Sequence, residues 1–546
     1  MKMNKWKYIA LVALISVVTS CDSGKDKSNN NGENTIEDSG FELEHTAKDI
    51  RKSLKTANIG KGLHNKEQVE EFYQNRDHAP AWKESENRTG FFNALTEAGE
   101  EGLRFSDYHG TELRPLLEDA DDLNEAEAAE LDILLTDAYL SYAHDLYFGK
   151  IDPKELYSLW GVPKEEKDLK QLLHQSLNNG DIAKDLGDLR PSHQVYRDLK
   201  LALKEFREIK DTEASFKKIA HGELIKPGQK DDRIPAIVNR LQELEVYPAE
   251  NPPRDSTYND TMQNAIKDFQ KNLGLQVDGV LGNSTISELN KTAAQRYDQI
   301  RANLERWRWY PRDLGEHHIL INIPAFQLAV VKNGDTVRSH NVIAGTKARQ
   351  TPVFSDSLEY VVINPEWHVP PTIKSKDVIP KASQNSSYLS KNNMTVTDNE
   401  GNVINPSNID WSSSDVNSYN FVQRAGPSNP LGRVKIIYPN QHLIYLHDTP
   451  AKDLFSQNQR AESSGCVRVE NALDLSGYVL SSQEDWTQEK IHEAVATGKT
   501  QQVQINQPIR VHHFYWTAWR AGDKTVFTGD IYELDEEIIS RLGTVN

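Results

Sequence analysis

The sequence predicts a multidomain α+β chain in which a helical N-terminal part precedes a mainly β C-terminal domain. The chain has 546 residues, and at about 150 residues per domain this length predicts three or four units. Apolar residues recur at helical spacing through most of the chain before residue 310, and from residue 319 they alternate with polar residues at the period of a strand. This change of period separates the helical units from the β domain.

The N-terminus has the features of an exported lipoprotein. Basic residues precede a short apolar run over residues 8–19, so residues 1–20 are expected to be a signal peptide. Residues 18–21 (Val-Thr-Ser-Cys) resemble the cleavage box of bacterial lipoproteins, which implies that Cys21 carries lipid. Residues 21–40, rich in Ser, Asn and Gly, predict a flexible tether. We therefore expect a protein of the cell envelope that faces the periplasm and is held to a membrane.

Charge and cysteine content restrict the function further. The net charge of −18 argues against nucleic acid as a partner, because phosphates are bound by clustered Lys and Arg. The two cysteines are Cys21 and Cys466, so a lipidated Cys21 leaves a single free thiol and no disulfide framework. An unpaired thiol in an oxidising compartment indicates a chemical role.

Residues 41–230 predict a helical domain, and its clearest helix spans residues 124–148. Asn124 and Glu127 are placed as a capping pair, and Gly149 stands where a C-cap is expected. The apolar stripe of this helix is predicted to be core and comprises Leu131, Leu134, Leu135, Ala138, Tyr139, Tyr142 and Leu146.

Residues 231–295 predict a small separate unit. Apolar residues recur at helical spacing from Met262 to Leu273, residues 277–282 turn the chain, and a second helix begins near Thr285. These residues resemble the three-helix peptidoglycan-binding module of cell-wall enzymes. The alternative is a structural spacer whose glycines serve only the turns.

The β domain is predicted over residues 296–530, followed by a tail at 531–546 that forms a last helix. Residues 295–310 predict a connecting helix whose tryptophans pack on a neighbouring domain. The predicted strands are 319–323, 326–331, 337–344, 358–364, 441–446, 502–509, 511–519 and 525–527, and the predicted helices are 469–482 and 486–496.

Within this domain, residues 373–426 lack periodicity and are rich in Ser and Asn. A segment of this length inside a compact domain is usually functional or disordered. We expect a lid over the active site, and the alternative is a disordered surface loop.

Two motifs indicate a thiol active site in the same domain. His447 stands at the end of the predicted strand 441–446, and residues 463–466 (Ser-Ser-Gly-Cys) form a small-residue turn. Taken alone, Cys466 is more simply a buried apolar residue. However, a thiol reacts as thiolate, and both His447 and the positive charge of Arg468 are placed to favour that form.

These motifs resemble a known family. Residues 447–450 (His-Asp-Thr-Pro) and 464–468 (Ser-Gly-Cys-Val-Arg) resemble the signature of the L,D-transpeptidase catalytic domain, which cross-links peptidoglycan through a catalytic cysteine. The resemblance implies a capping insertion at 373–426 and a scaffold domain in the helical part. Four further stretches resemble segments of the large, scaffold-bearing members: residues 79–82, 148–153, 364–371 and 426–433.

The resemblance also implies a mechanism and the role of each residue. Cys466 would attack a peptidoglycan tetrapeptide stem to form a thioester, which the amine of a second stem resolves into a 3→3 cross-link. His447 would act as general base, the backbone N–H groups of Gly465 and Cys466 would hold the oxyanion, and Arg468 would orient the loop or a substrate carboxylate. Ser464 fits a turn as well as a catalytic role. No cofactor or metal is expected.

Two other functions stay open from the sequence. The same thioester resolved by water would make an L,D-carboxypeptidase or a hydrolase, and a chain without chemistry would be a peptidoglycan-binding scaffold. The expected partners are donor and acceptor stems, a membrane reached through lipid on Cys21, and cell-wall synthesis proteins docked on the helical domain.

Overall fold

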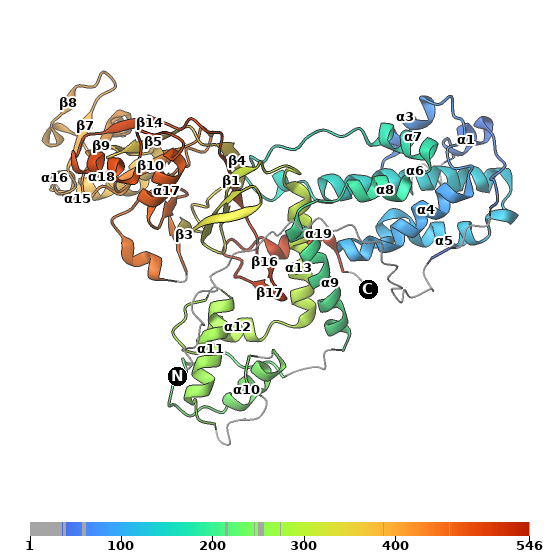
Figure 1. Cartoon of the computed structure of the whole chain (residues 1–546), viewed down its shortest axis with the longest axis horizontal. Coiled ribbons are helices and arrows are strands. Elements are labelled where there is room, and N and C mark those ends of the chain that lie inside the picture. Colours follow the sequence, from blue (N-terminus) through green and yellow to red (C-terminus); the bar gives the residue numbers. More distant parts are fainter. Residues whose placement is uncertain are drawn as a thin grey trace.

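The computed structural model describes residues 35–36, 40–56, 62–212, 217–244, 246–248, 256–273, 275–385, 387–457 and 459–544. The predicted signal peptide, the lipidation site Cys21 and most of the tether lie outside these residues. The helical N-terminal part and the sheet domain lie at opposite ends of the molecule, and the small module projects from the middle (Figure 1). No helix among the described residues has the length and apolar content needed to cross a membrane.

Helix α6 (Glu125–Phe148) is the central helix of the N-terminal part. The Asn124 side chain caps it by accepting the N–H groups of Ala126 and Glu127 at 3.0 and 3.1 Å. The Glu127 carboxylate in turn accepts the backbone N–H of Asn124, as predicted for a capping pair. The helices around it are α1 (Ala47–Ser53), α3 (Lys66–Gln74), α4 (Ser85–Thr96), α5 (Gly110–Glu118), α7 (Leu169–Asn179) and α8 (Ile182–Asp188).

The buried residues of helix α6 extend beyond the predicted apolar stripe, and one of them is Asp132. The Asp132 carboxylate accepts the backbone N–H groups of Ala81 and Trp82 at 3.0 and 2.9 Å, and the Tyr73 hydroxyl at 2.5 Å. Hydrogen bonds of this kind satisfy an acid inside a core. Asp132 therefore attaches the segment before α4 to α6.

Asp137 attaches a second segment to the same helix. Its carboxylate accepts the backbone N–H groups of His64 and Asn65 at 2.9 and 2.8 Å, just before α3, and the His109 ring N–H at 2.7 Å. The possible ligand atoms of His64, His109 and Asp137 lie within 4.8 Å of one another. Because the Asp137 oxygens already accept these three N–H groups, we interpret the cluster as structural.

The small module has three helices, as its sequence predicts: α10 (Ile234–Glu243), α11 (Asp260–Asn272) and α12 (Asn283–Leu289). Gln270 of α11 holds the turn that follows. Its amide donates to the carbonyl of Val280 at 3.0 Å and accepts the N–H of Gly279 at 2.9 Å.

Helix α13 (Ala293–Trp309) joins the parts of the molecule and packs along α9 (Gln194–Thr212). Trp307 stacks on Trp516 of the sheet domain with ring centroids 4.7 Å apart, as predicted for the tryptophans of this helix. Buried arginines reach in both directions: Arg308 donates to the carbonyl of Glu101 at 2.9 Å, and Arg306 pairs with Asp535 at 2.6 Å. The scaffold is therefore fixed to the sheet domain through α13.

The sheet domain contains one large mixed sheet. Its strands, in spatial order, are β14 (Gln501–Gln504), β5 (Tyr360–Ile363), β10 (Val434–Ile437), β11 (Leu446–His447), β13 (Val467–Val469), β3 (Asp335–Gly345), β2 (Gln327–Lys332), β1 (His317–Asn322), β15 (Arg510–Phe514) and β4 (Phe354–Ser357), with β12 (Ala461–Ser463) paired to β3.

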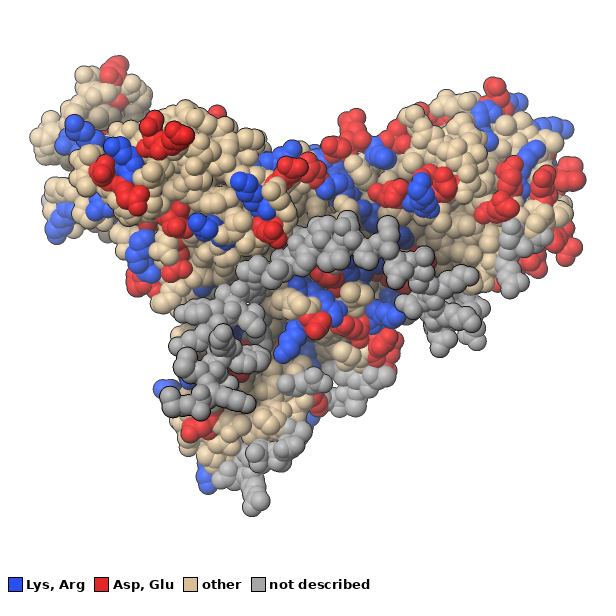
Figure 2. Space-filling view, in the orientation of Figure 1, with Lys and Arg blue, Asp and Glu red and all other residues tan. Residues whose placement is uncertain are grey.

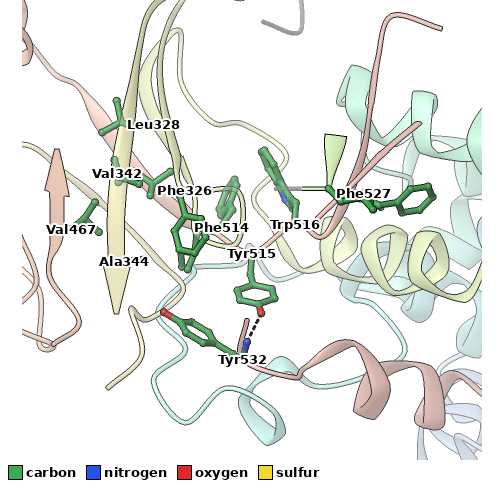
Figure 3. Close-up of a cluster of buried hydrophobic side chains, with 14 of the residues drawn as sticks. Phe326, Leu328, Val342, Ala344, Val467, Phe514, Tyr515, Trp516, Phe527 and Tyr532 are labelled. Atoms are coloured by element: carbon green, nitrogen blue, oxygen red, sulfur yellow. Dashed lines mark hydrogen bonds between the residues drawn. The ribbon is translucent and has the colours of Figure 1, made fainter. Parts of the chain in front are cut away.

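Figure 3 shows the centre of this domain, where side chains from β2, β3, β13 and β15 meet. Phe326, Val342 and Phe514 are among the buried residues. Beside them the Tyr515 hydroxyl accepts the backbone N–H of Tyr532 at 2.9 Å, which attaches the C-terminal segment to the sheet.

Some strand predictions were wrong in part. The strand expected at 441–446 is only β11, because residues 440–445 make turns around the side chain of Asn440, which accepts the N–H groups of His442 and Ile444. The strand expected at 511–519 is interrupted, and β16 (Ala518–Ala521) pairs with β17 (Lys524–Phe527) away from the main sheet. Edge strand β4 was not predicted.

The insertion at 373–426 is folded, which excludes the disordered loop. It contributes a π-helical turn (Lys374–Val378), α15 (Ile379–Gln384), α16 (Tyr388–Lys391), β7 (Met394–Thr397), β8 (Val403–Ile404) and β9 (Asn420–Gln423). The elements β6 (Trp367–His368) and α14 (Pro371–Ile373) lead into it. The strands form the sheet β6-β9-β7-β8 over a small core that includes Leu389, Val396 and Phe421. Dispersed apolar residues make this core, which is why no periodicity reveals it.

The three helices predicted near the C-terminus are present, with shorter bounds: α17 (Ala472–Leu480), α18 (Gln488–Ala496) and α19 (Asp535–Leu542).

Acidic and basic side chains are interspersed over both ends of the molecule in the view of Figure 2.

Candidate active site

Three polar side chains lie in one row across the middle of the sheet. Lys435 on β10 pairs with His447 on β11, and His447 pairs with Arg468 on β13. Directly paired residues on neighbouring strands point to the same face of a sheet. The row therefore places a cation on each side of the His447 imidazole.

Cys466 lies two residues before Arg468, at the end of a turn that leads directly into β13. The Ser463 hydroxyl accepts the N–H of Gly465 at 3.2 Å and donates to the carbonyl of Cys466 at 2.6 Å. Thr351 donates to the carbonyl of Gly465 at 2.8 Å. Gly465 has φ of +112°, a conformation that L side chains rarely adopt, so this position requires glycine.

The turn changes one expectation. The Gly465 N–H was predicted to hold an oxyanion, but in this structure it is engaged by Ser463. Ser464 takes no part in that bond and instead accepts Arg349 Nη1 at 2.9 Å. Ser464 and Arg349 both line the cleft.

The Cys466 thiol is largely enclosed, although the residue keeps some exposure. It donates weakly to the carbonyl of Leu443, with Sγ 3.7 Å from the oxygen. Burial raises the pKa of Cys466 to about 11, against the opposing influence of hydrogen bonds from Tyr445 and of the charges on Arg468 and Lys435. The resting nucleophile is therefore a thiol.

His447 is oriented by a backbone carbonyl. Its Nδ1–H donates to the carbonyl oxygen of Asp448 at 2.5 Å, which leaves Nε2 as the atom with a free lone pair. Burial, and after it the charge of Arg468, lowers the pKa of His447 to about 3. At neutral pH the imidazole is uncharged and able to accept a proton.

The Asp448 carboxylate does not orient the imidazole. It accepts the N–H of Arg433 at 2.9 Å and pairs with Lys452. Gly432 lies against it, and a Cβ there would be 2.3 Å from Asp448 Oδ2. Asp448 is thereby packed by the glycine of the 426–433 stretch, which explains why that stretch accompanies the His-Asp motif.

A cleft of about 900 Å³ opens over these residues. Cys466, His447 and Arg468 line it, and so do Ile373 and Lys376 at the start of the insertion. Trp367 and residues 370–372, which lead into the insertion, line it as well, so this end of the insertion forms one wall of the cleft. Its charged lining is basic, with Lys347, Arg349, Lys376 and Arg468, and no Asp or Glu is found among the described residues that line it. In a chain of net charge −18 this cleft favours anionic ligands.

Arg349 connects the cysteine turn to the insertion. The same Nη1 that donates to Ser464 lies 2.7 Å from Asp377 Oδ2, in the π-helical turn of the insertion. The side chains of Arg349 and Asp377 are partly exposed, so the pair can form and break at little cost.

The sequence did not identify Lys435 and Tyr445 as site residues. The Lys435 ammonium lies 5.5 Å from the centre of the Tyr445 ring, and that ring is 5.7 Å from the ring of His447. Alternation on the predicted strand before His447 places Tyr445 on the same face as His447, which is the signal that could have found it. Lys435 could be recognised as a site residue only from the pairing of β10 with β11, which the sequence does not show.

Three segments of this chain match families of known proteins. Residues 316–505 match the family described as "L,D-transpeptidase catalytic domain", residues 67–203 match "Scaffold domain", and residues 230–289 match "Putative peptidoglycan binding domain". A Haemophilus influenzae protein described as "Putative L,D-transpeptidase" is 37% identical over 242 residues, which are 44% of this chain and 48% of that protein. The match thus spans about half the length of this curated relative.

Solved structures give a weaker comparison. L,D-transpeptidases from Xylanimonas cellulosilytica and Mycobacterium smegmatis are 17% and 14% identical, cover 54% and 36% of this chain and 99% and 58% of their own, and have TM-scores of 0.17 and 0.18. TM-scores this low give no information about the site.

The match over residues 316–505 contains Cys466, His447, Arg468 and Lys435. The chain therefore carries an L,D-transpeptidase catalytic domain, combined with a scaffold domain and a peptidoglycan-binding domain.

Proposed function

We propose that this protein forms 3→3 cross-links in peptidoglycan through a thioester on Cys466. The observation that carries the proposal is the arrangement of the cleft: a single thiol in its lining, a neutral imidazole in the adjacent strand row and a basic lining. Tetrapeptide stems are peptides with free carboxylates, so a basic cleft attracts them.

In the first step the Cys466 thiol gives its proton to Nε2 of His447, and the sulfur attacks the carbonyl carbon of the third stem residue. The C–N bond to the terminal D-Ala breaks, and the imidazolium returns the proton to the leaving amine. The products are the thioester and free D-Ala. Because the pKa of Cys466 is raised and that of His447 is lowered, this transfer is unfavourable at rest and requires charge stabilisation by the site.

Two kinds of group can supply that stabilisation. Arg468 and Lys435 both act to lower the pKa of the Cys466 thiol, so they favour the thiolate. The backbone N–H of Cys466 is the remaining oxyanion donor of the predicted pair, with the Gly465 N–H available only if it leaves Ser463.

In the second step the side-chain amine of an acceptor stem attacks the thioester carbonyl. The amine proton passes to His447, the C–S bond breaks, and the sulfur takes that proton back as a thiol. Exclusion of water by the lid favours the amine over hydrolysis. Hydrolysis of the same thioester is the carboxypeptidase outcome.

Location is a separate part of the proposal. The basic and apolar N-terminal residues and the Cys21 box support export and lipid attachment, which would hold the enzyme beside its polymer. Membrane partition of the native protein, lost in Cys21→Ala, is the expected result. A lipid-modified Cys21→Ala protein would contradict it.

The proposed reaction is tested with purified protein and disaccharide tetrapeptide, with products separated and weighed by mass spectrometry. A cross-linked dimer is expected. Tripeptide without dimer would identify a carboxypeptidase, and an unchanged substrate would refute the proposal.

A further inference from the structure

One wall of the active-site cleft comes from the scaffold domain. Residues 156–159 (Leu-Tyr-Ser-Leu) line the cleft together with the loop at 347–353. They belong to the connection between α6 and α7, inside the matched scaffold domain. Figure 1 shows this connection running from the helical end of the molecule to the sheet. We call residues 156–159 the scaffold wall.

The scaffold wall is attached to the sheet at its C-terminal end. Gly161 forms a parallel bridge with Phe354 of edge strand β4, donating its N–H to the carbonyl of Val353 at 2.9 Å and accepting the N–H of Ser355 at 3.3 Å. A Cβ on Gly161 would lie 2.7 Å from Cβ of Phe354, so the close approach depends on glycine. The scaffold is thus joined to the edge of the catalytic sheet by a single β-bridge.

Side chains of helix α13 and of Tyr310, which follows it, pack against the segment that contains the scaffold wall. The buried Tyr157 hydroxyl accepts Nε–H of Arg306 at 3.1 Å, and its ring meets Trp309 with centroids 6.0 Å apart. Trp160 packs parallel to Tyr310, at 9° between the ring planes. The backbone on both sides of residues 158 and 159 is therefore fixed by buried contacts.

The residue held between these contacts is apolar and exposed. Leu159 is 47% exposed, although Tyr157 and Trp160, which flank residues 158 and 159, are anchored. An apolar side chain presented from a rigid backbone into a cleft is a typical ligand contact. Leu159 and Cys466 line the same cleft, and a chain of contacts joins their surroundings: Phe354 meets His442 edge-on at 5.4 Å, and the carbonyl of Leu443, the next residue, accepts the Cys466 thiol.

We infer that the scaffold wall recognises the peptide stem, with Leu159 packing against its aliphatic part while the basic residues of the cleft hold its carboxylates. This inference rests on the proposed function and deepens it. It makes the scaffold domain a part of the substrate-binding site, so that the separated catalytic domain would lack one wall of its cleft.

The test compares Leu159→Glu with Leu201→Glu, which alters a leucine that is 55% exposed on α9. Loss of an apolar contact and addition of a negative charge against an anionic stem should raise KM for the tetrapeptide donor by about tenfold in Leu159→Glu, with kcat within about twofold. Leu201→Glu should keep the wild-type KM. Equal KM values in both variants would overturn the inference.

A second measurement does not depend on turnover. A photoreactive benzophenone side chain at position 159, in a Cys466→Ala background, should cross-link to labelled tetrapeptide, and unlabelled tetrapeptide should compete. The same side chain at position 201 should give no competed product. A wild-type enzyme that uses tetrapeptide while position 159 never cross-links would refute the wall alone, whereas a wild-type enzyme that leaves tetrapeptide unchanged would refute the proposed function.

Discussion

The ring of His447 is held by the carbonyl of Asp448, its neighbour in the chain, through Nδ1–H at 2.5 Å. Adjacent residues on a strand point to opposite faces, so the side chain of Asp448 turns away from the cleft and only its backbone reaches the imidazole. The tautomer of the proposed base therefore depends on the position of the backbone at residue 448. That position in turn depends on what packs against Asp448.

Gly432→Ala should impair the site through this packing. The new Cβ would lie 2.3 Å from Asp448 Oδ2, and the residue has φ of +62°, so both the carboxylate and the backbone must shift. Misplacement of His447 should lower the rate of Cys466 acylation by at least about tenfold. Gly426→Ala is the matched control, because its Cβ would meet no atom within 4 Å. Equal acylation rates in the two variants, followed by intact mass, would contradict the orienting role.

The reactivity of Cys466 should follow the raised pKa of its thiol. With that pKa at about 11, alkylation by iodoacetamide should rise roughly tenfold per pH unit between pH 7 and 10. The pKa of His447 is lowered to about 3, so no inflection is expected near pH 6.5. A plateau reached below pH 9 would show a thiolate that the structure does not predict.

Lys435 should contribute to that reactivity by its charge. Lys435→Met removes a cation that favours the thiolate, so alkylation at a fixed pH should slow severalfold. Lys332→Met, on the exposed end of β2, should not change it. Equal rates for the two variants would remove Lys435 from the site.

Arg349→Ala should separate the lid from the cysteine turn. The variant loses the contacts to both Ser464 and Asp377, so the lid should admit more water to the thioester. The dimer-to-tripeptide ratio should fall severalfold, as measured by mass spectrometry of the products. Arg338→Ala removes an exposed pair with Asp474 elsewhere and should leave the ratio unchanged. A ratio unaffected by Arg349→Ala would show that the pair has no part in lid closure.

Asp137→Asn should destabilise the scaffold by about 2 to 4 kcal/mol at pH 7, because a buried acceptor of three N–H groups is weakened. Burial opposes ionisation of Asp137, but the hydrogen bonds from His109 and from the His64 and Asn65 backbone outweigh it and lower its pKa. The stabilisation is therefore present above the ordinary carboxyl pKa and is lost as the pH falls through the lowered value.

Urea unfolding at a series of pH values measures this effect. The gap between wild type and Asp137→Asn should narrow below about pH 4. Asp121→Asn, an exposed acid, should match wild type throughout. A gap that persists unchanged at pH 3 would contradict the role of the ionised carboxylate.

The sequence predicted what local patterns encode. The capping pair at Asn124 and Glu127, the strands around residues 319–344 and the cysteine turn all follow from short-range periodicity or turn chemistry. Lys435 could not be found in this way, because its place beside His447 is fixed by pairing between strands. The same holds for the core of the insertion, which contains both Leu389 and Phe421 although 31 residues lie between them in the sequence.

The scaffold wall shows most clearly which features the sequence alone could not predict. Residues 156–159 carry no motif of their own, and Leu159 acquires a place in the cleft only because Gly161 bridges to Phe354, far along the chain. The occupation of the Gly465 N–H by Ser463 was hidden for a similar reason: a Ser-Ser-Gly-Cys sequence does not specify which hydroxyl turns inward. Both depend on tertiary contacts.

The proposed reaction requires that a peptide stem is carried on the sulfur of Cys466. Wild-type protein mixed with tetrapeptide, quenched in acid and digested should give a peptide containing Cys466 that carries the acyl group of a tripeptide stem, and Cys466→Ala should form neither this adduct nor the dimer. Dimer produced by Cys466→Ala, or an adduct on any other residue, would contradict the account.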